Sequence, residues 1–137
     1  MKNIIFIAAA LFFSSDNYAT LTIQVQGLKQ TKGQVQIAIY NDANKFLKIG
    51  NEYRAESVAA TANVLTYTAK NLPNGEYAIA VFHDINSDGV LNLNFLGIPK
   101  EPYGFSKNIK PMWSAPTFSK TKVAVNADTQ ISIDLIN

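Results

Sequence analysis

The feature that most constrains this chain is a repeated alternation of apolar and polar residues, the period of a β-strand with one buried face. Residues 21–26 alternate in this way, and residues 34–39 repeat the pattern after a turn at Lys32-Gly33. Helical periodicity is weak throughout. The alternation predicts strands that pack one face against a core, and we expect these two segments to pair as a hairpin.

Further strands are predicted downstream. Residues 64–69 form a third, and residues 77–83 form a fourth that is apolar on both faces and therefore suits a central position in a sheet. Residues 122–125 and 130–136 flank a turn and predict a second hairpin. Six or more short strands indicate an all-β fold, a single antiparallel β-sandwich of the immunoglobulin or transthyretin-like kind.

Two stretches depart from this pattern. Residues 41–60 predict either a loop with one short helical turn or an edge strand. Residues 85–118 hold four of the five prolines and have little strand character. An irregular segment of that length is usually functional or counts against the assignment. We expect a functional loop, held to the sandwich by an ion site and by its aromatic side chains.

The N-terminus has the composition of a secretory signal peptide. Residues 1–3 are positively charged, residues 4–13 are an unbroken apolar stretch too short for a membrane span, and residues 14–19 become small and polar. We expect a signal peptide at 1–19, cleavage after Ala19, and a β-sandwich domain at 20–137. Export to the periplasm or the cell exterior follows. Since the chain has no cysteine, neither disulfides nor a lipoprotein anchor is expected.

Charge and composition exclude several classes of partner. The formal net charge is +2, and cleavage leaves it unchanged because one basic and one acidic residue are lost together. Without a basic run we expect no nucleic-acid binding, and without a second long apolar segment we expect no membrane span in the mature chain.

Residues 84–92 have the spacing of a calcium-binding loop, with short oxygen-bearing side chains at alternate positions and a glycine at the bend. The expected ligands are Asp84, Asn86, Asp88, the Val90 carbonyl and Asn92, with Gly89 at the turn. Phe95 stands where a helix-loop-helix site has its bidentate Glu. The preceding residues predict a strand rather than a helix, so this is not an EF-hand.

The missing ligand could be Asn94, Glu101 or water. Because only Asp84 and Asp88 are certain carboxylates, we expect weak Ca²⁺ binding, with a dissociation constant of roughly 0.1–1 mM. Carbonyl and amide oxygens favour Ca²⁺ over Mg²⁺ because Ca²⁺ is larger and more flexibly coordinated. The alternative is an Asx-rich turn that hydrogen-bonds its own backbone.

The stretch from Leu72 to Phe118 contains four further motifs: a strand entry, a His-Asp-x-Asn-x-Asp-Gly-x-Leu loop, a Gly-x-Pro-x-Glu-x-Tyr-Gly-Phe-Ser segment and a final Pro-x-Phe. Their residues are Pro73, Gly75, Tyr77, Ala78, His83, Asp84, Asn86, Asp88, Gly89, Leu91, Gly97, Pro99, Glu101, Tyr103, Gly104, Phe105, Ser106, Pro116 and Phe118. With these motifs the sequence resembles the secreted bacterial family known as domain of unknown function 2141. The family more often has Asp where this chain has Asn92, which makes Glu101 a more useful ligand here. The resemblance implies no activity, because the family is uncharacterised.

Catalysis is not expected. The one histidine, His83, would have to serve any triad or zinc motif, and no nucleophile elbow, cysteine nucleophile or phosphate-binding glycine loop is present. A hydrolase using Asp84, Glu101 and His83 remains an alternative. His83 could instead orient a ligating carboxylate, or bond the backbone at the end of its strand.

The aromatic residues Tyr103, Phe105 and Trp113 have two interpretations. They could form a platform for sugar rings or an envelope partner, or they could pack as core and lid of a small domain without cysteines. We therefore expect an exported, non-catalytic sandwich with a calcium-stabilised loop and a structural or interaction role in the cell envelope. A carbohydrate- or envelope-binding module is the alternative.

Overall fold

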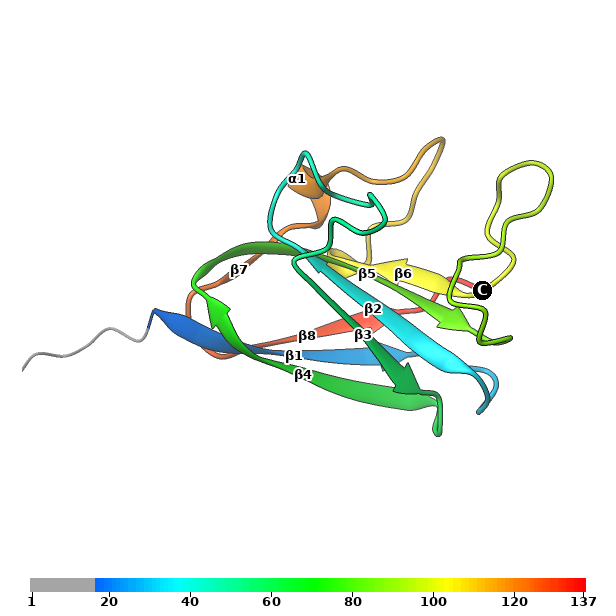
Figure 1. Ribbon diagram of the computed structural model, residues 1–137, viewed down its shortest axis with the longest axis horizontal. Coiled ribbons are helices and arrows are strands. Elements are labelled where there is room, and N and C mark those ends of the chain that lie inside the picture. Colours follow the sequence, from blue (N-terminus) through cyan, green and yellow to red (C-terminus); the bar gives the residue numbers. More distant parts are fainter. Residues whose placement is uncertain (1–16) are drawn as a thin grey trace, which may run out of the picture.

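The computed structural model describes residues 17–137, so most of the expected signal peptide lies outside the described residues. Two β-sheets pack face to face, with strand order β4-β1-β8 in one and β3-β2-β5-β6 in the other, where β7 also pairs with β5 (Figure 1). The predicted all-β sandwich is confirmed. The elements are β1 (Tyr18–Gln26), β2 (Gln34–Tyr40), β3 (Arg54–Ala59), β4 (Val64–Pro73), β5 (Gly75–Asp84), β6 (Tyr103–Phe105), the 3-10 helix η1 (Ser106–Asn108), α1 (Phe118–Thr121), β7 (Val123–Val125) and β8 (Thr129–Asp134).

The core lies between the sheets, where the apolar residues of the alternating strands meet. Leu21, Ile23 and Val25 of β1 are fully buried, and Ile37 of β2 and Ile79 of β5 join the same cluster from the other sheet. Burying an aliphatic side chain of this size contributes about 1.5–3 kcal/mol relative to leaving it exposed. Because the chain has no disulfide, this burial is a main source of its folding free energy.

The fourth predicted strand is central, as expected. β5 pairs along one edge with β2 and along the other with β7, at Gly75–Tyr77, and then with β6, at Ala80–Phe82. Its apolar residues therefore meet neighbours on both edges. The last residue of β5, Asp84, opens the long irregular segment.

Both predicted hairpins are wrong. β1 pairs with β4 and β8, whereas β2 pairs with β3 and β5, so residues 27–33 cross from one sheet to the other. β7 likewise pairs with β5, while β8 runs parallel to β1 in a sandwich expected to be antiparallel. Alternation indicates which face of a strand is buried, but not which sheet the strand joins.

The two irregular stretches contain short elements. The edge strand β3 occupies the second half of residues 41–60, while the first half forms turns. Residues 85–118 contain β6 and η1 and otherwise form loops, one of which extends beyond β5 at the right of Figure 1. Within residues 17–137, no helix has the length and apolar content that crossing a membrane requires.

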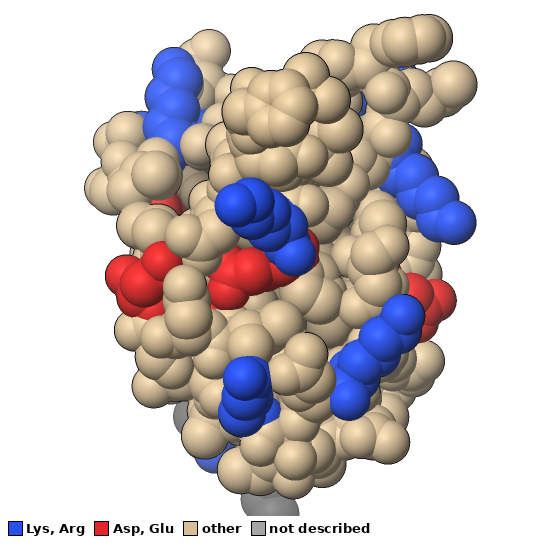
Figure 2. Space-filling model, turned by 90° about the vertical axis from the view of Figure 1, so that its right-hand side faces the viewer, with Lys and Arg blue, Asp and Glu red and all other residues tan. Residues whose placement is uncertain are grey.

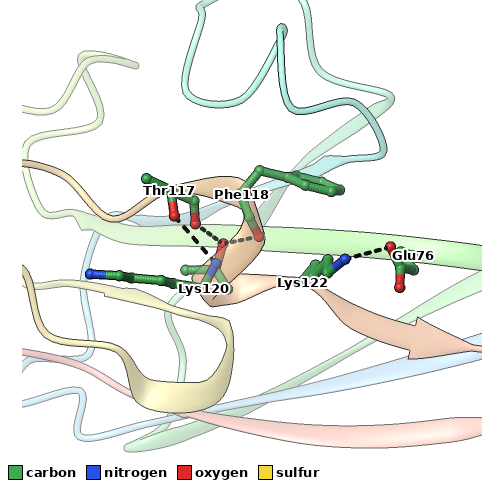
Figure 3. A network of polar contacts seen from close by, with 6 residues as sticks. Glu76, Thr117, Phe118, Lys120 and Lys122 are labelled. Carbon is green, nitrogen blue, oxygen red and sulfur yellow. Dashed lines mark hydrogen bonds and ion pairs between the residues drawn. The ribbon is translucent and has the colours of Figure 1, made fainter.

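The short helix α1 guides the chain back to β5. The Thr117 hydroxyl accepts the Lys120 N–H at 3.3 Å and caps the helix. Just after the helix, the Lys122 ammonium lies 3.0 Å from the Glu76 carboxylate of β5 (Figure 3). Both side chains are partly exposed, so this ion pair contributes little free energy. It marks the point where β7 begins to pair with β5.

Gly33 lets β2 approach the first residues of the long loop. Its φ is +70°, and a Cβ there would lie 2.2 Å from the Asp84 carbonyl oxygen and 2.8 Å from Ile85 Cα. Gly50 provides a matched comparison, because its φ is +84° but nothing lies within 4 Å of its Cβ position.

We expect Gly33→Ala to reduce the free energy of unfolding by about 2 kcal/mol or more, since the methyl group adds a backbone clash to the unfavourable φ. Gly50→Ala should cost about 1 kcal/mol, from its φ alone. Urea denaturation of both variants measures the difference. Equal losses would show that the contact with Asp84 is unimportant.

Candidate metal centre

Asp84 is a fully buried carboxylate at the end of β5. Its Oδ1 accepts the Asp88 N–H at 3.1 Å, and its Oδ2 accepts the Gly89 N–H at 2.8 Å and a Gln36 Nε2 hydrogen at 3.1 Å. A buried charge is stable only with such partners. Gly89, with a φ of +78°, permits the bend that turns its N–H toward Asp84. Asp84 therefore folds the first turn of the loop around itself.

Glu101 is a second carboxylate, 8% exposed, that joins the two ends of the same loop. Its Oε2 accepts the Ile85 N–H at 2.8 Å, and its Oε1 accepts the Asn92 N–H at 3.1 Å. Glu101, one of the possible sources of the missing ligand, therefore lies beside the loop residues. Residues 85 and 92 are thus fixed to one side chain that follows them in the sequence.

The carboxylates of Asp84, Asp88 and Glu101 form a group that could hold a metal ion, because one oxygen of each lies within 4.8 Å of the others. This separation is about twice a calcium–oxygen distance of roughly 2.4 Å, so the three oxygens could reach a common ion. A carboxylate offers about four lone-pair positions. The hydrogen bonds described above use three lone-pair positions on Asp84 and two on Glu101. Both carboxylates therefore keep at least one lone pair that could bind a metal ion.

Asp88 is the exposed member of the group. The Val90 N–H, which donates to Asp88 Oδ1 at 3.1 Å, lowers the pKa of this carboxyl below its ordinary value of 3.8, and hydrogen bonds with the side chains of Asn92 and Asn86 act in the same direction. The Asp88 carboxylate is therefore ionised at neutral pH. A charged oxygen facing solvent is available to a cation with little rearrangement.

The amide side chains of Asn86 and Asn92 lie at the same cluster. Asn86 Nδ2 donates to Asp88 Oδ2 at 3.1 Å and to Asn92 Oδ1 at 3.3 Å. The structure therefore gathers five of the predicted ligand residues, those at positions 84, 86, 88, 92 and 101. Val90 follows Asp88 in the same turn and donates its N–H to that carboxylate.

Asn94 is engaged elsewhere. Its Oδ1 accepts the N–H groups of Leu96 and Ile98 at 2.9 and 3.0 Å, so it organises the outer turn of the loop. We leave Asn94 out of the ligand set for this reason. The Asx-turn alternative is also present in the structure, since Asp88 and Asn94 each accept an N–H from two residues ahead. Such turns and ion binding are compatible, because each uses different lone pairs.

Residues 23–133 match the family described as Uncharacterized protein conserved in bacteria (DUF2141). The chain belongs to this family. The matched region covers most of the sandwich and the whole carboxylate cluster, so the resemblance inferred from the loop motifs is confirmed at the level of the family. Comparison with curated proteins and with solved structures gave no match.

His83 of this DUF2141 sandwich is buried, with 1% of its surface exposed. Its Nε2 lies 2.7 Å from the Lys32 carbonyl oxygen, and because a carbonyl only accepts, Nε2 must carry the hydrogen. Nδ1 is buried and has no partner among the described residues. The ring thus bonds the backbone at the end of its strand, which was one of the two predicted roles.

The three predicted aromatic contacts lie in different environments. Phe105 is buried, and its ring packs edge-on against Tyr103 with 6.0 Å between the centroids. Trp113 is 97% exposed. Tyr103 also lines a cleft of about 390 Å³ beside the loop, together with Lys29, Lys100 and Glu101 among others. Phe105 therefore belongs to the packing of the sandwich, while Trp113 remains open to solvent.

Sequence reasoning missed Gln36, which donates to Asp84 from 48 residues away. Its position in the alternating pattern of β2 indicates only a polar residue on the outer face of a strand. The contact depends on the pairing of β2 with β5, which aligns Gln34 with Asp84. Since the predicted hairpin placed β2 beside β1, no pattern in the chain could have brought Gln36 to the loop.

We expect Glu101→Gln to reduce the free energy of unfolding by about 1–3 kcal/mol, because a Gln amide offers one acceptor oxygen where two partly buried N–H groups need partners. Amide hydrogen exchange should quicken at Ile85 or Asn92. The exposed Glu56→Gln on β3 is the control and should change stability by less than about 0.5 kcal/mol. Unaltered exchange at both amides would contradict this role of Glu101.

Proposed function

We propose that this protein is an exported, non-catalytic β-sandwich whose loop from Asp84 to Glu101 is stabilised by calcium and which has a structural or interaction role in the cell envelope. The observation that carries the proposal is the convergence of the three carboxylates within 4.8 Å of one another. Export rests on the composition of residues 1–19, of which 1–16 lie outside the described residues.

The chemistry of the donors supports calcium. Every candidate ligand is an oxygen: the carboxylates of Asp84, Asp88 and Glu101, and an amide of Asn86 or Asn92, with the Val90 carbonyl and water to complete the shell. Hard cations prefer such oxygens, and calcium tolerates irregular geometry with six to eight ligands better than magnesium does. Three carboxylates are a small number of charged ligands for a calcium site, so we expect the affinity to be weak.

Calcium binding would add directly to stability. At a calcium concentration tenfold above the dissociation constant, the gain is about 1.4 kcal/mol. For a domain of this size, that corresponds to a rise in melting temperature of roughly 3–6 °C. A small domain without disulfides would benefit from an increment of this size.

Several contacts favour a non-catalytic role over a hydrolase. His83 is 1% exposed and its Nε2 donates to the Lys32 carbonyl, so this nitrogen is engaged by the backbone, although the residue borders the cleft beside Tyr103. Asp84 and Glu101 accept backbone N–H groups that define the loop. A general base must reach the group it deprotonates. These side chains instead maintain the fold around them.

A second candidate function is binding of a carbohydrate or an envelope partner. It is favoured by the cleft beside Tyr103 and by the fully exposed ring of Trp113. Glu101 lines this cleft and also belongs to the carboxylate group, so an ion could shape the cleft wall. The first proposal needs no such ligand.

We expect millimolar Ca²⁺ to raise the melting temperature by roughly 3–6 °C relative to excess chelator, because only the folded chain gathers the carboxylates. Asp88→Asn should remove most of this increment. Asp42→Asn is the matched control, since Asp42 also accepts an N–H from two residues ahead but lies outside the loop. A melting temperature indifferent to calcium would eliminate the metal site, and Mg²⁺ at the same concentration tests selectivity.

We also expect the mature chain to begin at Thr20 and to be found outside the cytoplasm. β1 starts at Tyr18, and Tyr18 and Ala19 pair with Pro73 and Leu72, so this cleavage would shorten β1 at its first two positions. Fractionation followed by intact-mass measurement decides the matter. A full-length, cytoplasmic chain would refute export.

A further inference from the structure

The outer part of the long loop exposes an unusual concentration of apolar side chains. Five of them lie within nine residues, and we call them the apolar tip. Phe95 is 96% exposed and Leu96 is 69% exposed, and the other three are each about half exposed. The tip consists of Val90, Leu93, Phe95, Leu96 and Ile98. An exposed apolar cluster of this kind marks an interaction site, because its contact with water is unfavourable.

The tip also lacks ionisable groups. From Gly89 to Pro99 the sequence contains no charged side chain, and its polar side chains are those of Asn92 and Asn94. The loop projects beyond the end of β5, away from both sheets (Figure 1). Most of the tip therefore projects from the sandwich, while Ile98 at its end also lines the cleft beside Tyr103.

The backbone of the tip satisfies many of its own hydrogen-bonding groups. The N–H groups of Leu96 and Ile98 donate to Asn94 Oδ1, while the Asn94 N–H donates to the Ile98 carbonyl at 2.8 Å and the Gly97 N–H to the Asn94 carbonyl at 2.9 Å. Unsatisfied backbone groups oppose transfer into hydrocarbon. This internal pairing lowers the cost of moving the tip into a lipid interface, whereas docking into a protein would not require it.

Basic side chains lie at the base of the projection, beside the carboxylates of the loop. Lys29 and Lys100 line the cleft next to the loop, and the Lys32 carbonyl accepts from His83 at the end of β5. Figure 2 shows this face, with basic side chains spread over it, acidic side chains at its centre and at both sides, and uncharged residues projecting above them. Lysines beside an apolar projection complement a surface of anionic headgroups.

The geometry points to a membrane-contact site: the apolar tip enters the interface of an anionic lipid surface, and Lys29 and Lys100 contact the headgroups. The chain does not span the bilayer in this arrangement. Without an ion, the carboxylates of Asp84, Asp88 and Glu101 at the same base oppose attraction to anionic lipid, so the inference rests in part on the proposed calcium site. If the ion binds as proposed, it also neutralises acidic charge on the same face and strengthens the attraction to anionic lipid.

The test is co-sedimentation of the exported protein with vesicles of phosphatidylcholine alone and with equal parts of phosphatidylglycerol, in calcium and in chelator. We expect binding to the anionic vesicles and weak binding to the neutral ones. Phe95→Ser combined with Leu96→Ser should reduce partitioning roughly tenfold or more, because both side chains leave water on insertion. Lys100→Gln should weaken binding to anionic vesicles alone.

Val64→Ser is the matched control, because Val64 is also an exposed aliphatic residue but lies at the start of β4 in the other sheet. It should bind as the unaltered protein does. Unchanged melting temperatures establish that the tip variants fold. The inference is overturned if the unaltered protein ignores both kinds of vesicle, if the tip variant binds normally, or if the tip serves only self-association seen by sedimentation velocity. A calcium-dependent melt without vesicle binding would reject this inference and leave the proposed function intact.

Discussion

The long loop depends on two buried carboxylates that replace secondary structure as the partners of its backbone. An irregular segment that packs against a sandwich must pair its buried N–H groups with something other than a ladder. Asp84 accepts the N–H groups of Asp88 and Gly89, and Glu101 accepts those of Ile85 and Asn92. A buried carboxylate needs hydrogen-bond donors, and these partly buried or exposed amides supply them, so each carboxylate holds the loop backbone that solvates it. The arrangement fixes the loop base and, as a consequence, gathers negative charge in one place.

The segment from Glu101 to Ser106 continues this anchoring along β5. The His83 N–H donates to the Pro102 carbonyl at 2.8 Å, which starts the contact between β5 and the returning chain. At Gly104 a Cβ would lie 2.7 Å from Ile133 Cγ2, so only glycine allows β6 to approach β8 so closely. The Ser106 hydroxyl accepts the Ile79 N–H at 3.0 Å and donates to the Thr121 carbonyl, tying β5 to α1 after β6 has ended. The residues of the Glu101-to-Ser106 segment therefore each have a structural partner. The spacing between them follows from the pairing of this segment with β5.

The sequence predicted the strands, and the residues that gather at the carboxylate cluster, better than it predicted their neighbours. Alternation located β1 and β2, and the two apolar faces of residues 77–83 predicted both β5 and its central place, because these properties belong to each strand alone. The hairpins failed because membership of a sheet is set by packing between distant segments. In the site, the spacing from Asp84 to Asn92 was informative because neighbouring residues share one turn. Gln36 could not be found in this way, and Asn94, which fits the spacing, is used by the outer turn instead.

The separation of charge and apolar surface along the loop has a physical reason. Carboxylates are costly to remove from water, so they are tolerated at the base, where backbone N–H groups and Gln36 compensate for lost hydration. The tip has no ionisable group to compensate, and its N–H groups are satisfied by Asn94 and by the turn itself. A charge placed between Gly89 and Pro99 would oppose entry into any apolar environment, whereas the same charge at Glu101 or Lys100 remains near the water layer. The loop thus combines a polar base suited to a cation with an outer end suited to an apolar medium. The base requires carboxylates, which the outer end lacks, and the outer end requires exposed apolar side chains, which would not bind a cation.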